Sequence, residues 1–313
     1  MIEPVNAQFL TVGEALVDIV VTKDGTHTEY PGGSPMNVAV TLGRLGHTSH
    51  LLTQIGADAR GDAIRQHIEA SSVTLTPGSI DTSHPTSTAL AELDETGAAS
   101  YTFDIFWSPN SSGIPEHLDG VHTSSIAAVL PPGADSVIEV LHSTRDHATI
   151  SYDPNARPAL MGSPENVRAT VEKIIALSDV VKASDEDIAW MYGTDDVESI
   201  ARTWLGLGPA FVAVTRGGDG ALGVCRQGRV EIPGVRVQVA DTVGAGDTFS
   251  AGILDALARK DLLGAKRREQ LRSISLPELT EVLTHAARCA AITVSRHGAN
   301  PPWLADLDSL SAE

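Results

Sequence analysis

Seven residues in the C-terminal third of the chain have the types and the spacing that a phosphate-binding turn needs. Residues 241–247 read DTVGAGD, so that Gly244, Ala245 and Gly246 come directly before Asp247. Small residues let an anion approach the backbone, and the amides that open a helix point toward such an anion, with the positive end of the helix dipole behind them. We therefore expect these three residues to form an anion site.

Asp247 lies in the first turn of the expected helix, within reach of the same anion. A carboxylate repels a phosphoryl group, but it can accept the proton of a hydroxyl that attacks that group. The alternative is structural, because an aspartate in a first turn often only stabilises the helix N-terminus. The glycines on either side of Ala245 favour the catalytic interpretation, and we expect Asp247 to act as a general base.

The segments around this motif predict the elements that position it. Residues 235–240 are β-prone, and Phe249, Ile253 and Leu257 recur at helical spacing within residues 248–260. The expected order is therefore a strand, a glycine turn and a helix.

From about residue 120 onward, short apolar runs alternate with amphipathic segments, a rhythm typical of βα units in a parallel sheet. The predicted strands are residues 124–130, 148–152, 179–183 and 210–215. The predicted helices between them are residues 134–146, 164–178 and 195–205.

The first hundred residues differ, because strand segments follow one another there as pairs joined by turns. The predicted pairs are residues 9–21 with 27–30, around a turn at 23–25, and residues 87–93 with 100–107, around a turn at 94–97. Two short helices are predicted between the pairs, at residues 37–45 and 62–70. Four strand segments of this kind indicate a small sheet that stands off the main body.

Composition excludes several classes of partner. The chain has 313 residues, 40 Asp and Glu against 22 Lys and Arg, and a formal net charge of −18, which repels nucleic acid and anionic lipid. Cys225 and Cys289 lie far apart and outside any CxxC pattern, and we find no signal peptide and no apolar run of membrane-spanning length. We expect one domain over residues 1–313, located in the cytoplasm.

The DTVGAGD sequence resembles the C-terminal signature of the ribokinase, or phosphofructokinase-B, family of sugar and nucleoside kinases. Two N-terminal segments are similar to the same family, GGSPMNVA at residues 32–39 and GEALVD at residues 13–18. The resemblance implies an ATP-dependent carbohydrate kinase with a doubly wound α/β fold, in which helices flank a mostly parallel sheet. It also implies a small β-sheet lid, formed by residues from about 14–31 and 87–108.

The resemblance assigns Asp18, Gly32, Gly33 and Asn37 to the sugar, residues 244–246 to the transferred phosphate and Asp247 to the base. Without it, the glycine pair is a turn, Asn37 is a helix cap or a solvated side chain, and Asp18 is a charge at a strand end.

Aromatic residues of the second strand pair are the candidates for the lid face. Phe103 is assigned to the sugar. Ile105 and Trp107 alternate with Asp104 and Phe106, and the sequence leaves open which of these two sets faces the sugar pocket.

The nucleotide must be held without a P-loop lysine, because no GxxxxGK[ST] sequence occurs in the chain. TRGGDG at residues 215–220 resembles the family's strand-end Thr and glycine turn near the ATP phosphates, although it could also be a plain hairpin turn. DPNARP at residues 153–158 resembles a segment of bacterial fructokinases in which an Asn and an Arg lie near the phosphates. Arg157 is assigned to the substrate, where its positive charge would offset the negative charge of the phosphates. The nucleotide-binding residues implied by the resemblance are Lys182, Ser184, Thr215, Gly217, Gly220 and Asn300.

Magnesium is expected to bridge the phosphates. The family's NxxE motif falls at residues 184–187, which read SDED, so that Asp187 becomes the candidate metal residue in place of a Glu. The alternative is a solvated acidic start of a helix. Residues 288–302 resemble the closing helix and loop of fructokinase-like members, which covers the adenine and could complete a site for a monovalent cation such as K⁺.

The motifs together resemble bacterial fructokinases more than other members of the family, so D-fructose is the expected acceptor. Ribose and 2-keto-3-deoxygluconate are alternatives within the same mechanism. A catalytically idle relative that senses sugar or nucleotide is an alternative of another class, and the intact DTVGAGD motif argues against it. A dinucleotide-binding oxidoreductase is disfavoured, because no GxGxxG follows the first strand. The family's lid strands often pair across a dimer, which makes a homodimer the expected assembly.

Overall fold

The computed structural model describes residues 5–22, 25–93 and 99–311. Its centre is a nine-stranded sheet in the order β15-β14-β13-β12-β11-β10-β1-β4-β6. The strands from β13 to β6 in that order run parallel to one another, whereas β14 pairs antiparallel with both β13 and β15. Their bounds are β1 Gln8–Val12, β4 Thr48–Leu52, β6 Val73–Leu75, β10 Gly120–Ser124, β11 Thr149–Asp153, β12 Val180–Ser184, β13 Phe211–Thr215, β14 Ala221–Cys225 and β15 Gly228–Ile232.

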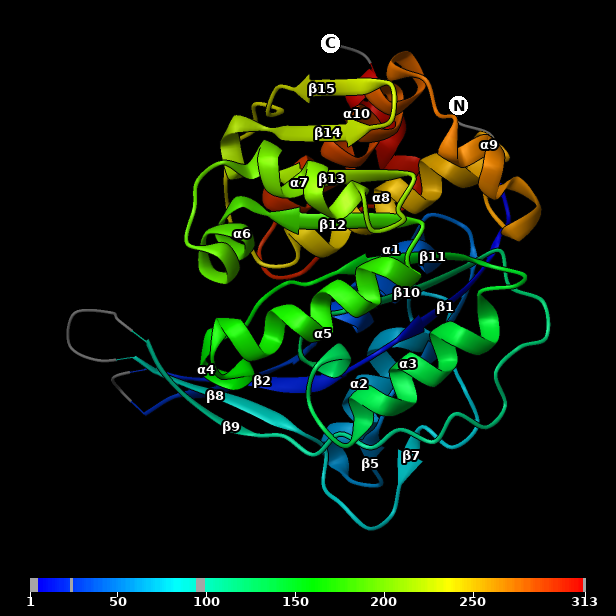
Figure 1. The fold of residues 1–313 in the computed structure, drawn as a ribbon. Helices are drawn as coiled ribbons and strands as arrows, with labels where there is room; N and C mark the ends of the chain where they lie inside the picture. Colours follow the sequence, from blue (N-terminus) through cyan, green and yellow to red (C-terminus); the bar gives the residue numbers. More distant parts are fainter. Residues whose placement is uncertain (1–4, 23–24, 94–98, 312–313) are drawn as a thin grey trace.

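Helices cover both faces of this sheet (Figure 1). On one face lie α1 (Ser34–Arg44), α8 (Ala245–Arg259) and α10 (Leu276–Val294), where Val38 of α1 and Leu254 of α8 belong to one buried cluster. On the other face lie α3 (Gly133–Thr144), α5 (Pro164–Leu177) and α7 (Val197–Leu205), whose apolar residues share a second core. The predicted doubly wound arrangement is confirmed. The other helices are α2 Ala59–Glu69, α4 Pro158–Met161, α6 Asp185–Tyr192 and α9 Arg268–Arg272, with 3-10 turns at Ser125–Ala128, Gly217–Asp219, Ala265–Arg267 and Leu304–Ser311.

A separate four-stranded sheet in the order β3-β2-β8-β9 projects from the main body (Figure 1). Its strands are β2 Leu16–Val21, β3 His27–Gly32, β8 Thr88–Leu93 and β9 Ala99–Asp104. The pairs β2/β3 and β8/β9 are antiparallel, which confirms both predicted strand pairs. The predicted turn at 94–97, and Lys23 and Asp24 of the other turn, lie outside the described residues. We call this sheet the lid. A short ladder of β5 (Ile55–Gly56) with β7 (Ile80–Asp81) lies apart from it.

The predicted strand at 9–21 is in fact two strands in different sheets. β1 belongs to the main sheet and β2 to the lid, and the chain turns between them at Gly13. A Cβ atom at Gly13 would lie 2.2 Å from Cγ of Pro35, so the chain passes too close to α1 for any larger residue.

The predicted strand at 124–130 is wrong for all but its first residue. β10 ends at Ser124, and Ser125 adopts a left-handed backbone conformation with φ of 59°, which starts a 3-10 turn. The apolar run from Ile126 to Ala128 is buried in the core from this turn, not from a strand. Burial alone produced the strand-like pattern.

Two further predicted boundaries are wrong. β9 ends at Asp104, and Trp107 is buried in the main body, where its Nε1 donates to the carbonyl oxygen of Ala127 at 2.9 Å. Residues 235–240 form no strand. The remaining predicted strands and helices lie within a few residues of those observed. Of the helices in the described ranges, none has the length and apolarity to cross a bilayer.

Candidate active site

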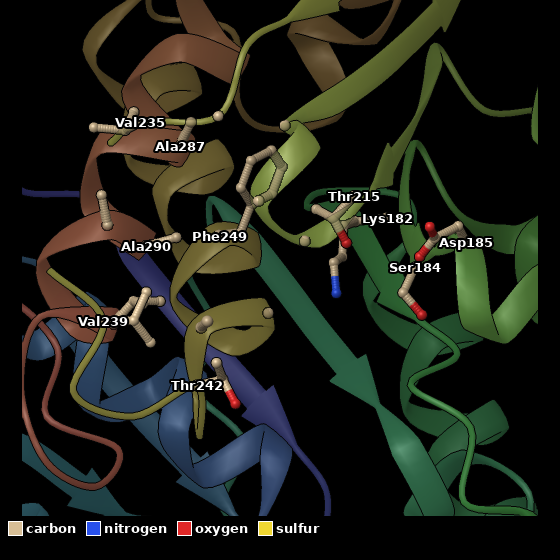
Figure 2. A pocket seen from close by; sticks show the side chains of 18 of the residues that line it. Lys182, Ser184, Asp185, Thr215, Val235, Val239, Thr242, Phe249, Ala287 and Ala290 are labelled. Atoms are coloured by element: carbon tan, nitrogen blue, oxygen red, sulfur yellow. The ribbon is translucent and has the colours of Figure 1, made fainter. Parts of the chain in front are cut away.

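A cavity of about 880 Å³ opens at the carboxyl ends of β12 and β13, the edge of a parallel sheet where ligands of such folds bind (Figure 2). Lys182, Ser184 and Thr215 line it from these strands, and the first turn of α8 lines it from the opposite side. The rest of the wall is polar at Asn155, Asp185, Glu186, Asp187, Arg236 and Thr242, and apolar side chains line it from the segment before α8 and from α8 and α10. They are Val235, Val237, Val239, Phe249, Ala287, Ala290, Ala291 and Val294.

This wall explains why residues 235–240 do not form the predicted strand. The alternating Val235, Val237 and Val239 line the cavity, and no neighbouring strand pairs with them in the described part of the chain. Val239 remains 63% exposed. The β-branched pattern therefore reflects the lining of a cavity and not a strand.

The first turn of α8 has the backbone geometry expected of an anion site. Gly244 precedes the helix in a left-handed conformation with φ of 76°. A Cβ atom at Gly244 would lie 2.8 Å from Cβ of Ala299, and one at Gly246 would lie 2.9 Å from Nζ of Lys182. Ala245 and Gly246 both line the cavity. A side chain at Gly244 would therefore collide with Ala299 in a left-handed backbone conformation, whereas one at Gly246 would displace only the end of the Lys182 side chain. The first turn of α8 borders the cavity with the positive end of the helix dipole behind it.

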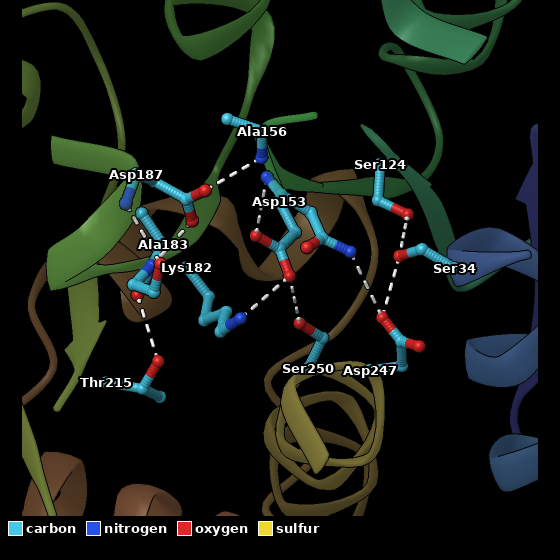
Figure 3. A network of polar contacts seen from close by, with 12 residues as sticks. Ser34, Ser124, Asp153, Ala156, Lys182, Ala183, Asp187, Thr215, Asp247 and Ser250 are labelled. Carbon is cyan, nitrogen blue, oxygen red and sulfur yellow. Dashed lines mark hydrogen bonds and ion pairs between the residues drawn. The ribbon is translucent and has the colours of Figure 1, made fainter. Parts of the chain in front are cut away.

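Asp247 is buried, and α1 holds its carboxylate (Figure 3). Oδ1 accepts a hydrogen bond from Oγ of Ser34 at 2.7 Å, and Oδ2 accepts one from Nδ2 of Asn37 at 2.8 Å. Asn155 Nδ2 lies 3.4 Å from Oδ1. The GGSPMN motif thus meets the DTVGAGD motif in space, although about 210 residues separate Ser34 and Asn37 from Asp247.

Sequence reasoning missed Ser34. Its Oγ also lies 2.8 Å from Oγ of Ser124, so the serine hydroxyl links the end of β10 to the carboxylate of Asp247. The available signal was its position one helical turn before Asn37, because residues three apart share a helix face. The chain reaches α1 through Gly33, where φ is 116° and a Cβ atom would lie 2.5 Å from the carbonyl oxygen of Glu14.

A second buried carboxylate was also missed. Asp153, at the end of β11, forms an ion pair with Lys182 with 2.9 Å between Oδ2 and Nζ, and Oγ of Ser250 donates to the same oxygen at 3.3 Å (Figure 3). Burial raises the pKa of Asp153 to about 6, although the ammonium of Lys182 opposes this rise. Burial lowers the pKa of Lys182, but the charges of Asp153 and Asp187 outweigh it, and the net shift is upward. The pair is therefore ionised at neutral pH.

Asp187 lines the cavity, yet its carboxylate is already engaged by the backbone. Oδ2 accepts from the amide of Ser184 at 2.8 Å in a capping box that starts α6, and Oδ1 accepts from the amide of Ala156 at 2.7 Å. These bonds join the SDED and DPNARP segments. Within the described ranges, no group of three or more His, Cys, Asp or Glu side chains is placed to hold a metal ion. The metal role of Asp187 stays a prediction.

The glycine turn between β13 and β14 lines the cavity through Gly217, Gly218 and Gly220. A Cβ atom at Gly220 would lie 1.9 Å from the carbonyl oxygen of Ile232, so a larger residue cannot stand there. The turn is a hairpin connection and it also borders the cavity, and its contact with ATP phosphates stays a prediction.

The residues assigned to the sugar lie outside this cavity, toward the lid. Asp18 is on β2, and a Cβ atom at Gly32 of β3 would lie 2.1 Å from its Oδ2. Burial raises the pKa of Asp18 to about 6, and the charge of Arg157 opposes the rise. Arg157 is exposed and donates from Nη1 to Oδ1 of Asn155 at 2.8 Å. Phe103, on β9, is half-buried.

Asn300, which the resemblance assigns to the nucleotide, lies away from the cavity. Its Oδ1 accepts from Nη1 of Arg44 at 2.7 Å, and it is not among the described residues that line the cavity. The ring of Phe106 stacks on that of His84 with 3.6 Å between ring centroids, and which set of lid residues faces the sugar stays a prediction.

The fold and the site together define an ATP-dependent sugar kinase with a ribokinase-like architecture. The sequence pattern of the pfkB family carbohydrate kinase matches residues 6–306, and the chain belongs to this family. The resemblance predicted from the motifs is confirmed.

Curated proteins and a solved structure that are similar to this chain are fructokinases. The chain is 34% identical over 266 residues to a fructokinase from Rhizobium leguminosarum bv. trifolii, with 81% of each chain covered. It is 31% identical over 304 residues to a fructokinase from Klebsiella pneumoniae, with 94% of this chain and 95% of the other covered. A solved fructokinase double mutant from Vibrio cholerae O395, in a fructose, ADP and potassium ion bound form, is 27% identical with a TM-score of 0.79, covering 98% of this chain and 99% of that one.

Proposed function

We propose that this protein transfers the γ-phosphoryl group of ATP to a hydroxyl of D-fructose. The observation that carries the proposal is the carboxylate of Asp247, which stands at the anion-binding start of α8 and is held by Ser34 and Asn37. The fructokinases to which the chain is 34% and 31% identical support fructose as the acceptor.

Asp247 would remove the proton of the attacking hydroxyl. Two hydrogen bonds fix its carboxylate, so little reorganisation is needed when the hydroxyl arrives. The amides at 244–246 would stabilise the negative charge that moves between the oxygens during transfer. Transfer is direct, and closure of the lid over the sugar would exclude water that could otherwise accept the phosphoryl group.

The cavity suits a nucleotide. Its apolar wall, with Phe249 and the alanines of α10, offers a slot for a planar base, whereas Lys182 and the start of α8 offer positive charge to phosphates. We place ATP here, with residues 288–302 closing over the adenine through their helical part.

A divalent cation, Mg²⁺, is proposed to accompany ATP and would offset charge on the phosphate oxygens. The carboxylates of Asp185 and Glu186 line the cavity and could orient metal-bound water, and Asp187 stays the candidate for closer contact. A monovalent cation is proposed near the loop at 298–300, where Asp241 accepts from the amide of Gly298 at 2.9 Å. The potassium-bound fructokinase structure supports this second proposal.

The test of the acceptor is ADP formation from ATP and Mg²⁺ with D-fructose, ribose and 2-keto-3-deoxygluconate. We expect kcat/KM for fructose to exceed that for each other sugar by at least about tenfold, a difference of roughly 1.4 kcal/mol. Preference for another sugar would discard fructose and keep the mechanism. Absence of turnover by folded protein that binds ATP would overturn the proposal in favour of a sensor.

A further inference from the structure

The glycine turn that starts α8 is backed by the loop that follows α10. A Cβ atom at Gly244 would lie 2.8 Å from Cβ of Ala299, so the two segments are in close contact. Asp241 joins the same two segments, because its Oδ2 accepts from the amide of Gly298 at 2.9 Å and its Oδ1 accepts from the amide of Val243 at 3.0 Å. The conformation of the turn therefore depends on the position of this loop.

The loop has little backbone structure of its own. Residues 297–300, all of which the structure describes, belong to no helix or strand, and His297, Gly298 and Asn300 are exposed. A backbone hydrogen bond runs within the loop from the amide of Asn300 to the carbonyl oxygen of Gly298 at 2.8 Å. Exposed segments with few such bonds open locally at a low cost in free energy. Contacts from outside the loop are therefore needed to hold it in one conformation.

Arg44, the last residue of α1, makes such contacts. Its Nη1 donates to Oδ1 of Asn300 at 2.7 Å and to the carbonyl oxygen of Pro301 at 2.9 Å. Its guanidinium lies over the ring of Trp303, 5.1 Å from the centroid, in a cation–π arrangement. Its Nε donates to Oγ of Ser71 at 3.1 Å, so the planar group is held in one orientation. The arginine thus joins the end of α1 to the end of the loop.

The surroundings of Arg44 are unfavourable for its charge. Burial lowers the pKa of the Arg44 guanidinium, and the charge of the nearby Arg296 lowers it further, whereas Asp306 opposes the shift. Arg296 itself pairs with Asp306, with 3.0 Å between Nη2 and Oδ2. Removing a charged group from water costs free energy unless hydrogen bonds replace the lost hydration. A solvated surface arginine has no such cost, so the position of Arg44 indicates a specific contact with the loop.

Helix α1 carries both this arginine and the residues that hold the base. Ser34 and Asn37 in its first turn donate to Asp247, and Arg44 stands at its other end. All ten residues from Ser34 to Gly43 are buried. Close-packed interiors deform little and transmit displacements, so the two ends of α1 move together.

We propose that Arg44 is a positioning residue for phosphoryl transfer, which holds the loop at 298–301 so that Ala299 fixes the backbone of Gly244 at the proposed anion site. This inference rests on the proposed kinase function. Arg44 is not among the described residues that line the cavity, so it acts through the loop and not on a ligand. Helix α1 then positions the base from one end and the glycine turn from the other.

The first test compares Arg44→Met with Arg65→Met, an exposed arginine of α2, in steady-state assays with ATP, Mg²⁺ and fructose at constant KCl. We expect kcat of Arg44→Met to fall by about tenfold or more, because a displaced turn stabilises the transferred group less well. The KM for fructose should stay within about twofold, because Arg44 and Asn37 lie at opposite ends of α1. Arg65→Met should match the wild type. A folded Arg44→Met protein with kcat within about threefold of the wild type would overturn the proposal.

The Asn300→Ala variant tests the route from Arg44 to the turn, and it covers the case in which Arg44→Met does not fold. The substitution removes an acceptor of the guanidinium, and we expect kcat to fall by about threefold or more. The double variant should be no slower than Arg44→Met alone, because the effects of residues in one network do not add. An unchanged kcat in Asn300→Ala, or losses that multiply in the double variant, would contradict this route.

Hydrogen exchange at the amides of Val243 and Gly298 needs no sugar and separates this inference from the kinase proposal. Both amides donate to Asp241, one from the turn and one from the loop. In Arg44→Met both should exchange about tenfold faster or more, while the amides of α3 keep their wild-type rates. Faster exchange throughout the protein, as for a merely structural role, or unchanged exchange at both amides would contradict the assignment. If the local change is found but the wild type phosphorylates no sugar, the kinase proposal fails and the contact between Arg44 and the turn stands.

Discussion

Asp247 can act as a base only if its carboxylate is held in one orientation near the acceptor hydroxyl. Ser34 and Asn37, one helical turn apart on α1, each donate to a different oxygen of that carboxylate. Hydrogen bonds to a charged group contribute roughly 1.5–3 kcal/mol each. The two side chains therefore decide which lone pairs remain available to the sugar.

Replacement of Ser34 by Ala removes one of these donors. We expect kcat to fall by about tenfold or more, because misorientation of the base affects the transfer step, while the KM for ATP stays within about twofold. Steady-state kinetics on the purified variant measures both values. Ser143→Ala, on the distant α3, is the matched control. Equal kinetics for Ser34→Ala and the wild type would show that Asn37 alone orients the carboxylate.

At the residue scale the sequence predicted the positions of the candidate residues better than their contacts. Asp247 and residues 244–246 could be placed from their types and spacing, because a glycine turn before a helix has few uses. The hydrogen bonds of Ser34 and the ion pair of Asp153 could not, because they join positions that are 213 and 29 residues apart in the chain. Such contacts depend on strand order, which the local pattern does not contain.

Helix α8 has two functions along its length. Its first turn is the proposed anion site, and its second half is anchored by Asp255, whose side chain is fully buried. Oδ1 of Asp255 lies 2.9 Å from Nε2 of His47, and Oδ2 lies 2.6 Å from Nε2 of His285 and 2.9 Å from Nε of Arg259. The cluster joins α8 to the segment before β4 and to α10.

Replacement of Asp255 by Asn should destabilise the fold without touching the chemistry. The substitution removes the negative charge that faces Arg259 and two histidines and replaces one acceptor oxygen by a donor, and breaking a buried pair of this kind costs roughly 3–5 kcal/mol. Urea unfolding of the variant measures the loss. A change below about 1 kcal/mol would contradict this account of the cluster.

The same carboxylate makes stability depend on pH. Burial alone would raise the pKa of Asp255, but the hydrogen bonds from His285, His47 and Arg259 outweigh it and hold the pKa well below its usual range. The contribution is therefore fully present above the unfolded-state pKa of about 3.9 and is lost as the pH falls below that value. In Asp255→Asn this acid-dependent loss should be smaller.

At the scale of elements, two apolar segments were wrongly predicted as strands. Their apolar residues are there for another reason than pairing in a sheet. Ile126 and Ala127 are buried from a 3-10 turn, and the valines at 235–239 line a cavity. Where a run was flanked by helices of sheet-crossing length, as for β11, β12 and β13, the strand was placed within a residue or two. The alternation of strands and helices along the chain therefore predicts strand positions better than the residues of a single segment do.

The whole molecule brings two polar regions to one edge of the sheet. The cavity proposed for the nucleotide lies at the ends of β12 and β13, and the lid leaves the main body after β1 at the same edge (Figure 1). Asp247 lies between the cavity and the residues assigned to the sugar. The predicted pairing of lids in a homodimer stays a prediction.

Burial of Asp18 at the lid predicts that kcat/KM for fructose decreases on the acid side of its pH profile. Its pKa is raised to about 6, so protonation below that pH would remove an acceptor for sugar hydroxyls, and kcat/KM for fructose should fall as the pH drops through about 6. Asp153, with a pKa also raised to about 6, could produce the same limb. The Asp18→Asn variant separates the two, because an unchanged limb in that variant would exclude Asp18 as its source.

The most direct test of the central claim is a single-turnover measurement of fructose phosphorylation by the wild type and by Asp247→Asn, with ATP binding measured on both. The account predicts a rate lower by about 10²–10⁴-fold in the variant, the usual contribution of a general base, with ATP affinity retained. A rate within about tenfold of the wild type would contradict the assignment of Asp247 as the base.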